Sequence, residues 1–345
     1  AYTYRQRGER YAAGAKLNAM PMRRRQLVAL PLLGAGAALA VLAAALSGPV
    51  NIDLAALGSD AVVASIFYDI RLPRALTAAL VGSGLACSGA AIQGLFRNPL
   101  ADPALIGVSG GAALFAGMAI VLGVPAFTAL GVPLSAFIGG MLTTMLVLYI
   151  GRVGGTISHM LLAGIAINTV AIAGMGLLSY VATDAALRTM TFWALGSFNG
   201  ATWSGVALAL VIPVATVLLT AQGRGLNAMT LGDSQAIHLG VSVGRLRGYV
   251  IVLAALVVGV SVAIAGVIAF VGLIIPHLIR LGVSSSHYIV LPGSALGGAL
   301  LLVLADTLGR TVVAPLEIPV GILTALIGGP FFVFLILRQR ARLGF

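Results

Sequence analysis

The chain has 345 residues, of which 60% are hydrophobic and only 8% are charged, and its mean hydropathy is +1.09. Because a soluble globular domain carries about 25% charged residues, this composition excludes a water-soluble protein and indicates one that lies in a membrane. The formal net charge of +11 could suit a nucleic-acid-binding protein, but the positions of the charges favour membrane topology instead.

Residues 1–26 form a polar, basic segment that ends in MRRRQ directly before the first long apolar run. A basic segment before an apolar one is also the pattern of a secretory signal peptide. This apolar run is longer than a signal peptide requires, and no clear small-residue cleavage site follows it. We therefore expect a cytoplasmic tail over 1–26, followed by one transmembrane domain over 27–345.

Apolar runs of about 20 residues, the length that crosses a hydrocarbon core of ~30 Å, recur along the rest of the chain. They predict an all-α, polytopic membrane protein of about ten transmembrane helices. Gly266 separates the seventh run from a short eighth one, and a merger of these two would leave nine spans and put the termini on opposite sides. The predicted spans are 27–46, 75–96, 103–122, 132–150, 157–181, 205–221, 248–265, 267–281, 290–308 and 320–337.

The basic residues divide unevenly between the two sides of the membrane in this ten-span topology. With the N-terminus in the cytoplasm, all but four of the 20 Lys and Arg residues fall in cytoplasmic segments, as the positive-inside rule requires of short loops. We therefore expect both termini in the cytoplasm, and no nucleic-acid partner. The four exceptions are Arg71, Arg74, Arg188 and Arg310.

The stretch FRNPLADPALIGVSGG interrupts the apolar pattern after the second span. Asn98-Pro99 predicts a turn, and Asp102-Pro103 predicts a helix start, with the Asp as N-cap and the Pro at the first helical position. The same stretch contains a G-x-S-x-G pattern that would carry Ser109 as the nucleophile in a hydrolase. Because this serine lies inside an apolar helix and the four histidines lie in other segments, the small residues favour close helix packing instead.

The sequence carries no nucleotide-binding motif that could supply energy for transport. A P-loop needs a lysine that contacts the nucleotide phosphates, and the single lysine, Lys16, lies in the tail. Ion-coupled carriers tend to place ionisable residues in mid-membrane, whereas the span interiors here are almost free of charge and Asn168 is their clearest polar group. If the chain moves a solute uphill, we expect another subunit to supply the energy. An ion-coupled secondary transporter and an intramembrane hydrolase are the alternatives from other classes.

Residues 222–247 form the longest cytoplasmic connection between predicted spans. Within it, Asp233 is expected to cap a short helix over 234–239 that Gly240 terminates. Apolar side chains on this segment are suited to docking into a partner, although a helix that lies on the bilayer surface fits the pattern as well. These side chains are Met229, Leu231, Ile237 and Leu239.

The outer arginines depart from the positive-inside rule, which indicates that they have a specific role. One interpretation is a docking patch for an acidic soluble partner, formed by Arg71, Arg74 and Arg310. The other is local pairing within the chain, for example of Asp69 with Arg71 or of Asp306 with Arg310.

Three segments resemble the vitamin B12 and iron-chelate permease family of type II ABC importers: RLPRALTAALVGSGLACSGAAIQGLFRNPLADPALIGVSGGA, LGDSQAIHLGVSVGRLR and AFVGLIIPHLIRL. The resemblance covers about residues 65 to 340 in the same order. It implies a homodimer in the bacterial inner membrane, with a pathway between two ten-helix subunits. It also implies two ATPase subunits that bind ATP on the cytoplasmic side, and one periplasmic substrate-binding protein outside. The chain itself would then be a non-catalytic permease subunit.

The same resemblance assigns roles to individual residues. It implies that the outer arginines meet glutamates of the binding protein, that one helix lines the pathway, and that two inner segments act as gate and as coupling helix. The implied sets are Arg71, Arg74 and Arg310 for docking; Asn98, Leu100, Thr156 and Ser158 for the cytoplasmic gate; Asp233, Ser234, Ile237, His238, Leu239 and Gly240 for ATPase coupling; and Gly164, Asn168, Gly174 and Gly176 for the pathway.

The cargo is suggested by LRTMTFWALGSFNGATW, residues 187–203, which is similar to the corresponding stretch of haem permeases in this family. Arg188 could attract a haem propionate at the outer mouth, and Met190, Phe192 and Trp193 could face the flat ring. An interfacial aromatic girdle is the alternative reading. No permanently bound cofactor or metal is expected; haem would be the transported substrate, with an iron–siderophore or cobalamin as alternatives.

Overall fold

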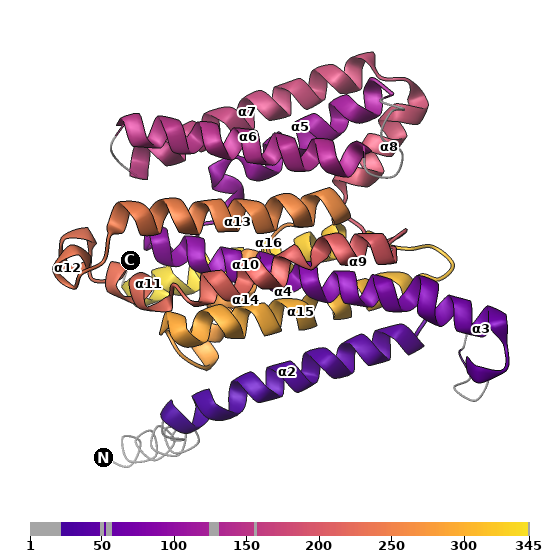
Figure 1. Ribbon diagram of the computed structural model, residues 1–345, viewed down its shortest axis with the longest axis horizontal. Coiled ribbons are helices and arrows are strands. Elements are labelled where there is room, and N and C mark those ends of the chain that lie inside the picture. The colour runs from indigo at the N-terminus through magenta and orange to yellow at the C-terminus, as the bar shows by residue number, and fades with distance from the viewer. Residues whose placement is uncertain (1–21, 49–51, 53–56, 124–130, 155–156, 344–345) are drawn as a thin grey trace, which may run out of the picture.

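Figure 1 shows the computed structural model of the chain, which describes residues 22–48, 52, 57–123, 131–154 and 157–343. Throughout these residues the regular secondary structure is helical, without a β-strand. The long helices are α2 (Met22–Leu46), α4 (Leu72–Phe96), α5 (Val108–Val121), α6 (Gly131–Gly154), α7 (Ile157–Val181), α13 (Val243–Ala265), α14 (Val271–Gly282), α15 (His287–Thr311) and α16 (Val320–Leu343). The short ones are α3 (Ala61–Ser65), η2 (Ile66–Arg71), η3 (Pro103–Ile106), α8 (Asp184–Ala194), α9 (Trp203–Ala209), α10 (Val211–Thr220), α11 (Gly223–Met229) and α12 (Asp233–His238).

The apolar helices match the predicted spans. Seven helical segments of the described chain are long and apolar enough to cross a membrane, and three shorter apolar helices, within α5, α14 and α16, complete the set. Each of the ten predicted spans overlaps one of these segments. The all-α, polytopic prediction is therefore confirmed. Residues 1–21 of the predicted tail lie outside the described residues.

Helix α4 lies at the centre of the molecule, between α15, α13, α14 and α10. Most of its residues are buried, and many are Gly or Ala. Their small size lets neighbouring backbones approach closely, which is how membrane helices pack without a hydrophobic driving force. A Cβ built on Gly82 would lie only 2.2 Å from the carbonyl oxygen of Gly298 in α15. The glycines at this contact are therefore required by the distance between the two helices.

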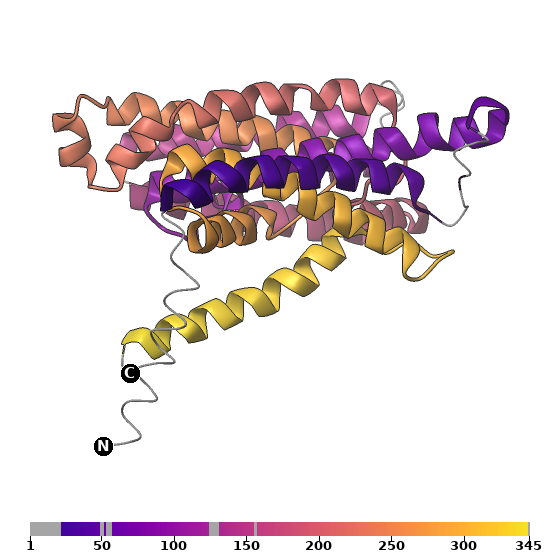
Figure 2. The same cartoon turned by 90° about the horizontal axis from the view of Figure 1, so that it is seen from below.

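Helices α5, α6 and α7 form a layer of their own, which α6 joins to the centre through α13 (Figure 1). Helix α16 instead slants away from the body of the molecule, as the yellow ribbon in Figure 2 shows, and it contacts α14 and α15. Its outer surface is strongly apolar, with Leu326 and Phe334 both more than half exposed. The single chain thus leaves a large apolar surface uncovered.

Several predicted boundaries were wrong in informative ways. The second span begins earlier than predicted, because α3, η2 and α4 form one continuous helical segment over Ala61–Phe96. The third span does not begin as an α-helix at Pro103. Asp102 does accept a hydrogen bond from the N–H of Ala104 at 2.8 Å, as a cap should, but the residues that follow form only the 3₁₀-helix η3. Gly107, with a φ of +79°, then redirects the chain into α5.

Candidate functional site

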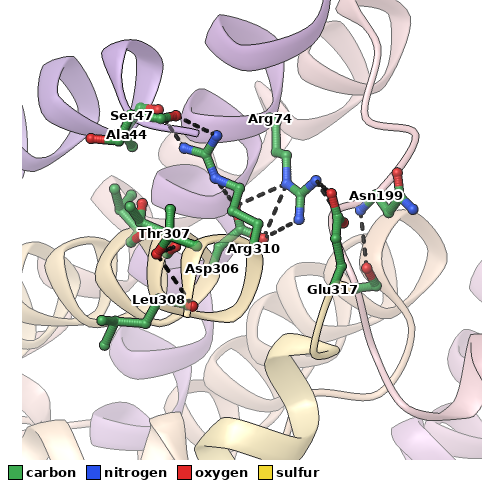
Figure 3. Close-up of polar contacts among 12 residues, drawn as sticks. Ala44, Ser47, Arg74, Asn199, Asp306, Thr307, Leu308, Arg310 and Glu317 are labelled. Carbon is green, nitrogen blue, oxygen red and sulfur yellow. Dashed lines mark hydrogen bonds and ion pairs between the residues drawn. The ribbon is translucent and has the colours of Figure 1, made fainter. Parts of the chain in front are cut away.

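Arg74 is the centre of a buried ionic cluster at the end of the molecule where α4 begins (Figure 3). Its Nε donates to Oδ2 of Asp306 at 2.9 Å, and its Nη2 donates to Oδ1 of the same carboxylate at 2.9 Å. Its Nη1 donates to Oε2 of Glu317 at 3.0 Å. One arginine therefore ties α4 to α15 and to the connection between α15 and α16. Paired, fork-shaped contacts of this kind are the strong form of the arginine–carboxylate interaction.

Arg71 and Arg310 both bind the C-terminal end of α2. Arg310 donates through Nη1 to the carbonyl oxygen of Ser47 at 2.8 Å and through Nη2 to that of Ala44, as Figure 3 shows. Arg71 donates to the carbonyl oxygen of Leu46 at 2.8 Å. The last carbonyls of a helix lack intrahelical partners and carry partial negative charge, so cations are well placed there.

The predicted docking arginines are therefore buried and bound within this chain. Arg71, Arg74 and Arg310 are 4%, 8% and 4% exposed. The predicted local pair of Arg310 with Asp306 is present, with Nε 3.7 Å from Oδ2, whereas Asp69 accepts a hydrogen bond from Ser65 at 2.9 Å. A docking role for these arginines stays a prediction, and it would require at least one guanidinium to exchange partners.

A cavity of about 700 Å³ lies beside this cluster, and its lining includes Arg188, Phe192, Trp193 and Glu317. Arg188 and Phe192 are on α8, which the ten-span prediction missed, and both are exposed. Met190 on the same helix is 3% exposed, so the expectation that it faces a ligand was wrong. The cavity thus combines an exposed cation and aromatic surface with one carboxylate.

At the opposite end of the molecule, residues 97–101 form the predicted turn after α4. Arg97 adopts a left-handed conformation with a φ of 53° and caps the helix. The side-chain Oδ1 of Asn98 accepts a hydrogen bond from the N–H of Leu100 at 2.9 Å, which closes the turn. Thr156, the other predicted gate residue, lies outside the described residues, and Ser158 is in the first turn of α7.

Helix α12 confirms the predicted short helix in the cytoplasmic connection, but Asp233 does not cap it. The helix begins at Asp233 itself, and Gly232 occupies the cap position. The Asp233 carboxylate lies instead between two arginines, 3.3 Å from Nη2 of Arg97 and 3.1 Å from Nη2 of Arg247. Gly240 ends the helix as predicted, with a φ of +83°. The ion pairs connect the turn after α4, the short helix and α13.

We expect Arg97 and Asp233 to be energetically coupled. In a double-mutant cycle of Arg97→Gln and Asp233→Asn, the coupling free energy of unfolding should be about 0.2–1 kcal/mol, because both side chains are partly exposed. Thermal unfolding of the four proteins in detergent measures it, and molar salt should remove it. Strict additivity of the two substitutions at low salt would contradict the pair.

The apolar surface of this segment is only partly as predicted. Leu231, Ile237 and Leu239 are all more than half exposed, whereas Met229 is fully buried. Of the remaining predicted coupling residues, Ser234 and His238 are exposed. Three large apolar side chains are thus exposed at one small helix, and a partner subunit or the bilayer surface would cover such a surface.

Helix α7 presents two different faces. Its predicted pathway residues Gly164, Asn168 and Gly174 face η3 and α5: a Cβ on Gly164 would lie 1.8 Å from the carbonyl oxygen of Leu105, and the Asn168 side chain lies against Gly110. In the single chain these three positions serve helix packing, while Gly176 is exposed. The opposite face is apolar and exposed, with Leu162, Val170, Ile172, Leu177 and Tyr180.

Comparison with known proteins identifies the family. The model of the FecCD transport family matches residues 32–338. The chain belongs to the FecCD transport family. The hemin transport system permease protein HmuU of Yersinia pestis is 48% identical over 281 residues, which are 80% of this chain and 84% of HmuU. The vitamin B12 import system permease protein BtuC of Salmonella paratyphi A is 39% identical over 272 residues, which are 79% of this chain and 83% of BtuC.

Solved structures agree with the FecCD assignment. An inward-facing metal-chelate type ABC transporter superposes with a TM-score of 0.80 and 35% identity, over 89% of this chain and 99% of that chain. PsaBC from Streptococcus pneumoniae, at a TM-score of 0.55 and 19% identity over 81% of this chain and 93% of that one, shares the fold. The resemblance read from the sequence is thus confirmed, and the chain is a multi-pass membrane permease of the ABC-transporter type.

In this FecCD-family chain, sequence reasoning missed the residues that form ion pairs with Arg74 and Asp233. Glu317 was not assigned a role, and Arg97 and Arg247 were counted only as topology signals. Glu317 becomes recognisable only when distant segments meet, since Arg74 and Glu317 are 243 positions apart. Helix α8 did carry a local signal, because Thr183 caps it through a hydrogen bond from the N–H of Ala186 and Asp184 follows in the first turn.

Proposed function

We propose that this chain is the permease subunit of an ATP-driven importer that carries haem from a periplasmic binding protein to the cytoplasm. The observation that carries the proposal is the 48% identity with a hemin permease over most of both chains, against 39% with a vitamin B12 permease. Import of an iron–siderophore or of cobalamin by the same mechanism is the second candidate, which membership of the FecCD transport family supports.

The cavity beside α8 fits the chemistry of haem. Its volume of about 700 Å³ is in the range of small-molecule sites. The exposed Arg188 guanidinium can pair with a propionate carboxylate, and the exposed ring of Phe192 and the neighbouring Trp193 offer flat apolar surface to a macrocycle. Glu317 at the other side of the lining limits how much negative charge the cavity accepts.

The uncovered surfaces of the chain support a larger assembly. We propose that two copies of this chain form the pathway, with the exposed apolar faces of α7 and α16 between them. Two ATPase subunits would bind ATP and cover Leu231, Ile237 and Leu239 on the cytoplasmic side, and one binding protein would dock at the end where Arg71, Arg74 and Arg310 lie. The location is the bacterial inner membrane, with both termini in the cytoplasm, a tail over 1–26 and a permease domain over 27–345.

Alternating access then follows from the connected elements. Movement of α12 under the ATPase subunits would be transmitted through Asp233 to Arg97, and so to the turn at Asn98–Leu100 that would close the inner side. The chain contributes shape, gating and docking, and the energy comes from ATP hydrolysis in the partner. Reconstitution tests this: haem uptake into vesicles should require both ATP and the ATPase subunit. Uptake that persists without the ATPase but collapses with an ion gradient would support a secondary transporter instead.

We expect Arg188→Gln to lower hemin uptake by about tenfold or more, because removal of a charge-assisted hydrogen bond costs about 1.5–3 kcal/mol and every 1.4 kcal/mol is a factor of ten. Uptake of hemin with both propionates esterified should be insensitive to the substitution, since it offers no carboxylate. Arg188→Lys, which keeps the charge, is the control and should retain most of the uptake. Equal loss with both cargoes would contradict a propionate contact.

The absorbance spectrum of the cognate binding protein tests the cargo separately. Purified from cells grown with hemin, it should show a haem-like Soret band. A corrinoid spectrum, or that of a ferric siderophore, would replace haem by the second candidate and leave the permease function intact.

A further inference from the structure

A cavity with a volume of about 1210 Å³ lies at the end of the molecule that carries α11 and α12. Its lining comes from the C-terminal end of α6, the start of α7, the start of α11 and the first turns of α13 (Figure 1, left). Four apolar spans begin or end here, at Gly151, His159, Thr220 and Val243. The cavity therefore lies where the hydrocarbon region gives way to the polar boundary of the membrane.

The lining of this cavity combines apolar and basic side chains. Leu148, Met160 and Val252 provide apolar walls, while Arg245 and Arg247 are on the first turns of α13. The described lining residues include no carboxylate. An anionic group with an apolar body fits this division, since basic pockets between membrane helices are known to bind the head groups of anionic lipids.

The two arginines retain hydrogen-bonding capacity for a ligand. Arg245 is exposed and donates a hydrogen bond from Nη2 to Oγ of Ser242 at 2.9 Å. Arg247 shares the single carboxylate of Asp233 with Arg97, and its Nε is buried without an acceptor among the described residues. Two cations thus line this cavity. Among the described residues their one anionic partner is Asp233, which pairs with Arg247 and also with Arg97 outside the lining.

Space for the ligand is kept open by small residues. Gly244 and Gly248 are part of the lining on α13, and Gly225 on α11 faces it. A Cβ on Gly244 would meet nothing within 4 Å. Tyr249, 41% exposed, stands at the rim, in the position that tyrosines favour at a membrane interface.

We propose that this cavity binds a phospholipid with an anionic head group, phosphatidylglycerol or cardiolipin in class, with the phosphate at Arg245 and Arg247 and an acyl chain along the wall at Leu148 and Val252. A soluble anion would use the arginines alone and would leave the apolar walls exposed to water. The inference does not depend on the cargo of the permease, so it stands or fails separately from the proposed function.

Native mass spectrometry of the purified transporter tests the site. Phosphatidylglycerol is titrated against phosphatidylcholine of the same acyl chains, and the preference for the anionic lipid is measured. Arg245→Gln should reduce that preference about fivefold, the contribution of one basic residue at a membrane surface. Arg224→Gln is the matched control, because Arg224 is exposed on neighbouring α11 but is not part of the lining; it should leave the preference unchanged. Arg245→Lys should retain it.

Four results would overturn the proposal. An unchanged preference in Arg245→Gln would remove the site, and equal losses in Arg245→Gln and Arg224→Gln would reduce it to general surface charge. Displacement of phosphatidylglycerol by millimolar inorganic phosphate would indicate a soluble-anion site. If Arg245→Gln weakened binding of the ATPase subunit and left lipid binding unchanged, the cavity would be a protein contact.

Discussion

Replacement of Asp306 by Ala is expected to destabilise the protein by about 3–5 kcal/mol, the cost of leaving a buried charge without its partner. The Asp306 side chain is only 5% exposed. It accepts hydrogen bonds from two nitrogens of Arg74 and lies 3.7 Å from Nε of Arg310. Its loss would leave two positive charges close together in the interior. A large fall in the unfolding temperature of the purified permease, or loss of folded protein from the membrane, measures the effect.

Glu317→Ala is the matched control for this experiment. Glu317 pairs with the same guanidinium at 3.0 Å, but its side chain is 36% exposed, so water can replace it. We expect a loss of no more than about 1 kcal/mol. If Asp306→Ala and Glu317→Ala had the same free energy of unfolding, burial would not decide how much each carboxylate contributes. The structural role assigned to the buried pair of Arg74 and Asp306 would then be refuted.

Replacement of Gly82 by Ala is expected to cost about 1–3 kcal/mol, the usual effect of forcing an extra carbon into a packed interior. The new Cβ would lie 2.2 Å from the carbonyl oxygen of Gly298 and 3.0 Å from Cβ of Leu302. Because the first of these contacts is backbone, no side-chain rotation can relieve it. Helices α4 and α15 would have to separate, and α4 is the helix around which the other central helices pack.

Gly176→Ala provides the opposite result with the same chemical change. A Cβ on Gly176 meets nothing within 4 Å, so the substitution should be neutral or stabilise α7 by up to about 1 kcal/mol through helix propensity. Unfolding temperatures of the two variants in the same detergent give the comparison. Equal unfolding temperatures for Gly82→Ala and Gly176→Ala would show that the backbone contact at Gly82 does not limit packing there.

The spans were predictable because the preference of a 20-residue segment for hydrocarbon is a property of that segment alone. The break at Gly266 is a further local property, since that residue has a φ of +69°, which glycine adopts readily. Helix α8 was missed because the prediction searched for spans, and its 11 residues are too few and too mixed in polarity to form one. The hairpin after α4 was predicted from Asn98 and Asp102, whose side chains bind backbone groups within two positions.

The partners of the charged side chains could not be predicted in this way. Arg74 meets Asp306, 232 positions along the chain, and the sequence offers no distance information over such a separation. The positive-inside rule counted Arg71, Arg74 and Arg310 as exceptions on the outer side of the membrane. Such a count treats each arginine as a charge in water. Their burial depends on where α2, α15 and the connection to α16 lie.

By itself, the sequence determined that this protein is a helical membrane protein, where its spans lie and which segments interrupt them, because hydropathy, capping and turn formation act over a few neighbouring residues. The tertiary structure alone decided that the outer arginines hold helix ends together, that Asp233 joins two segments instead of capping one, and that Gly164 packs against η3 and Asn168 against α5. These outcomes depend on contacts between remote segments, which form only when the whole chain is folded.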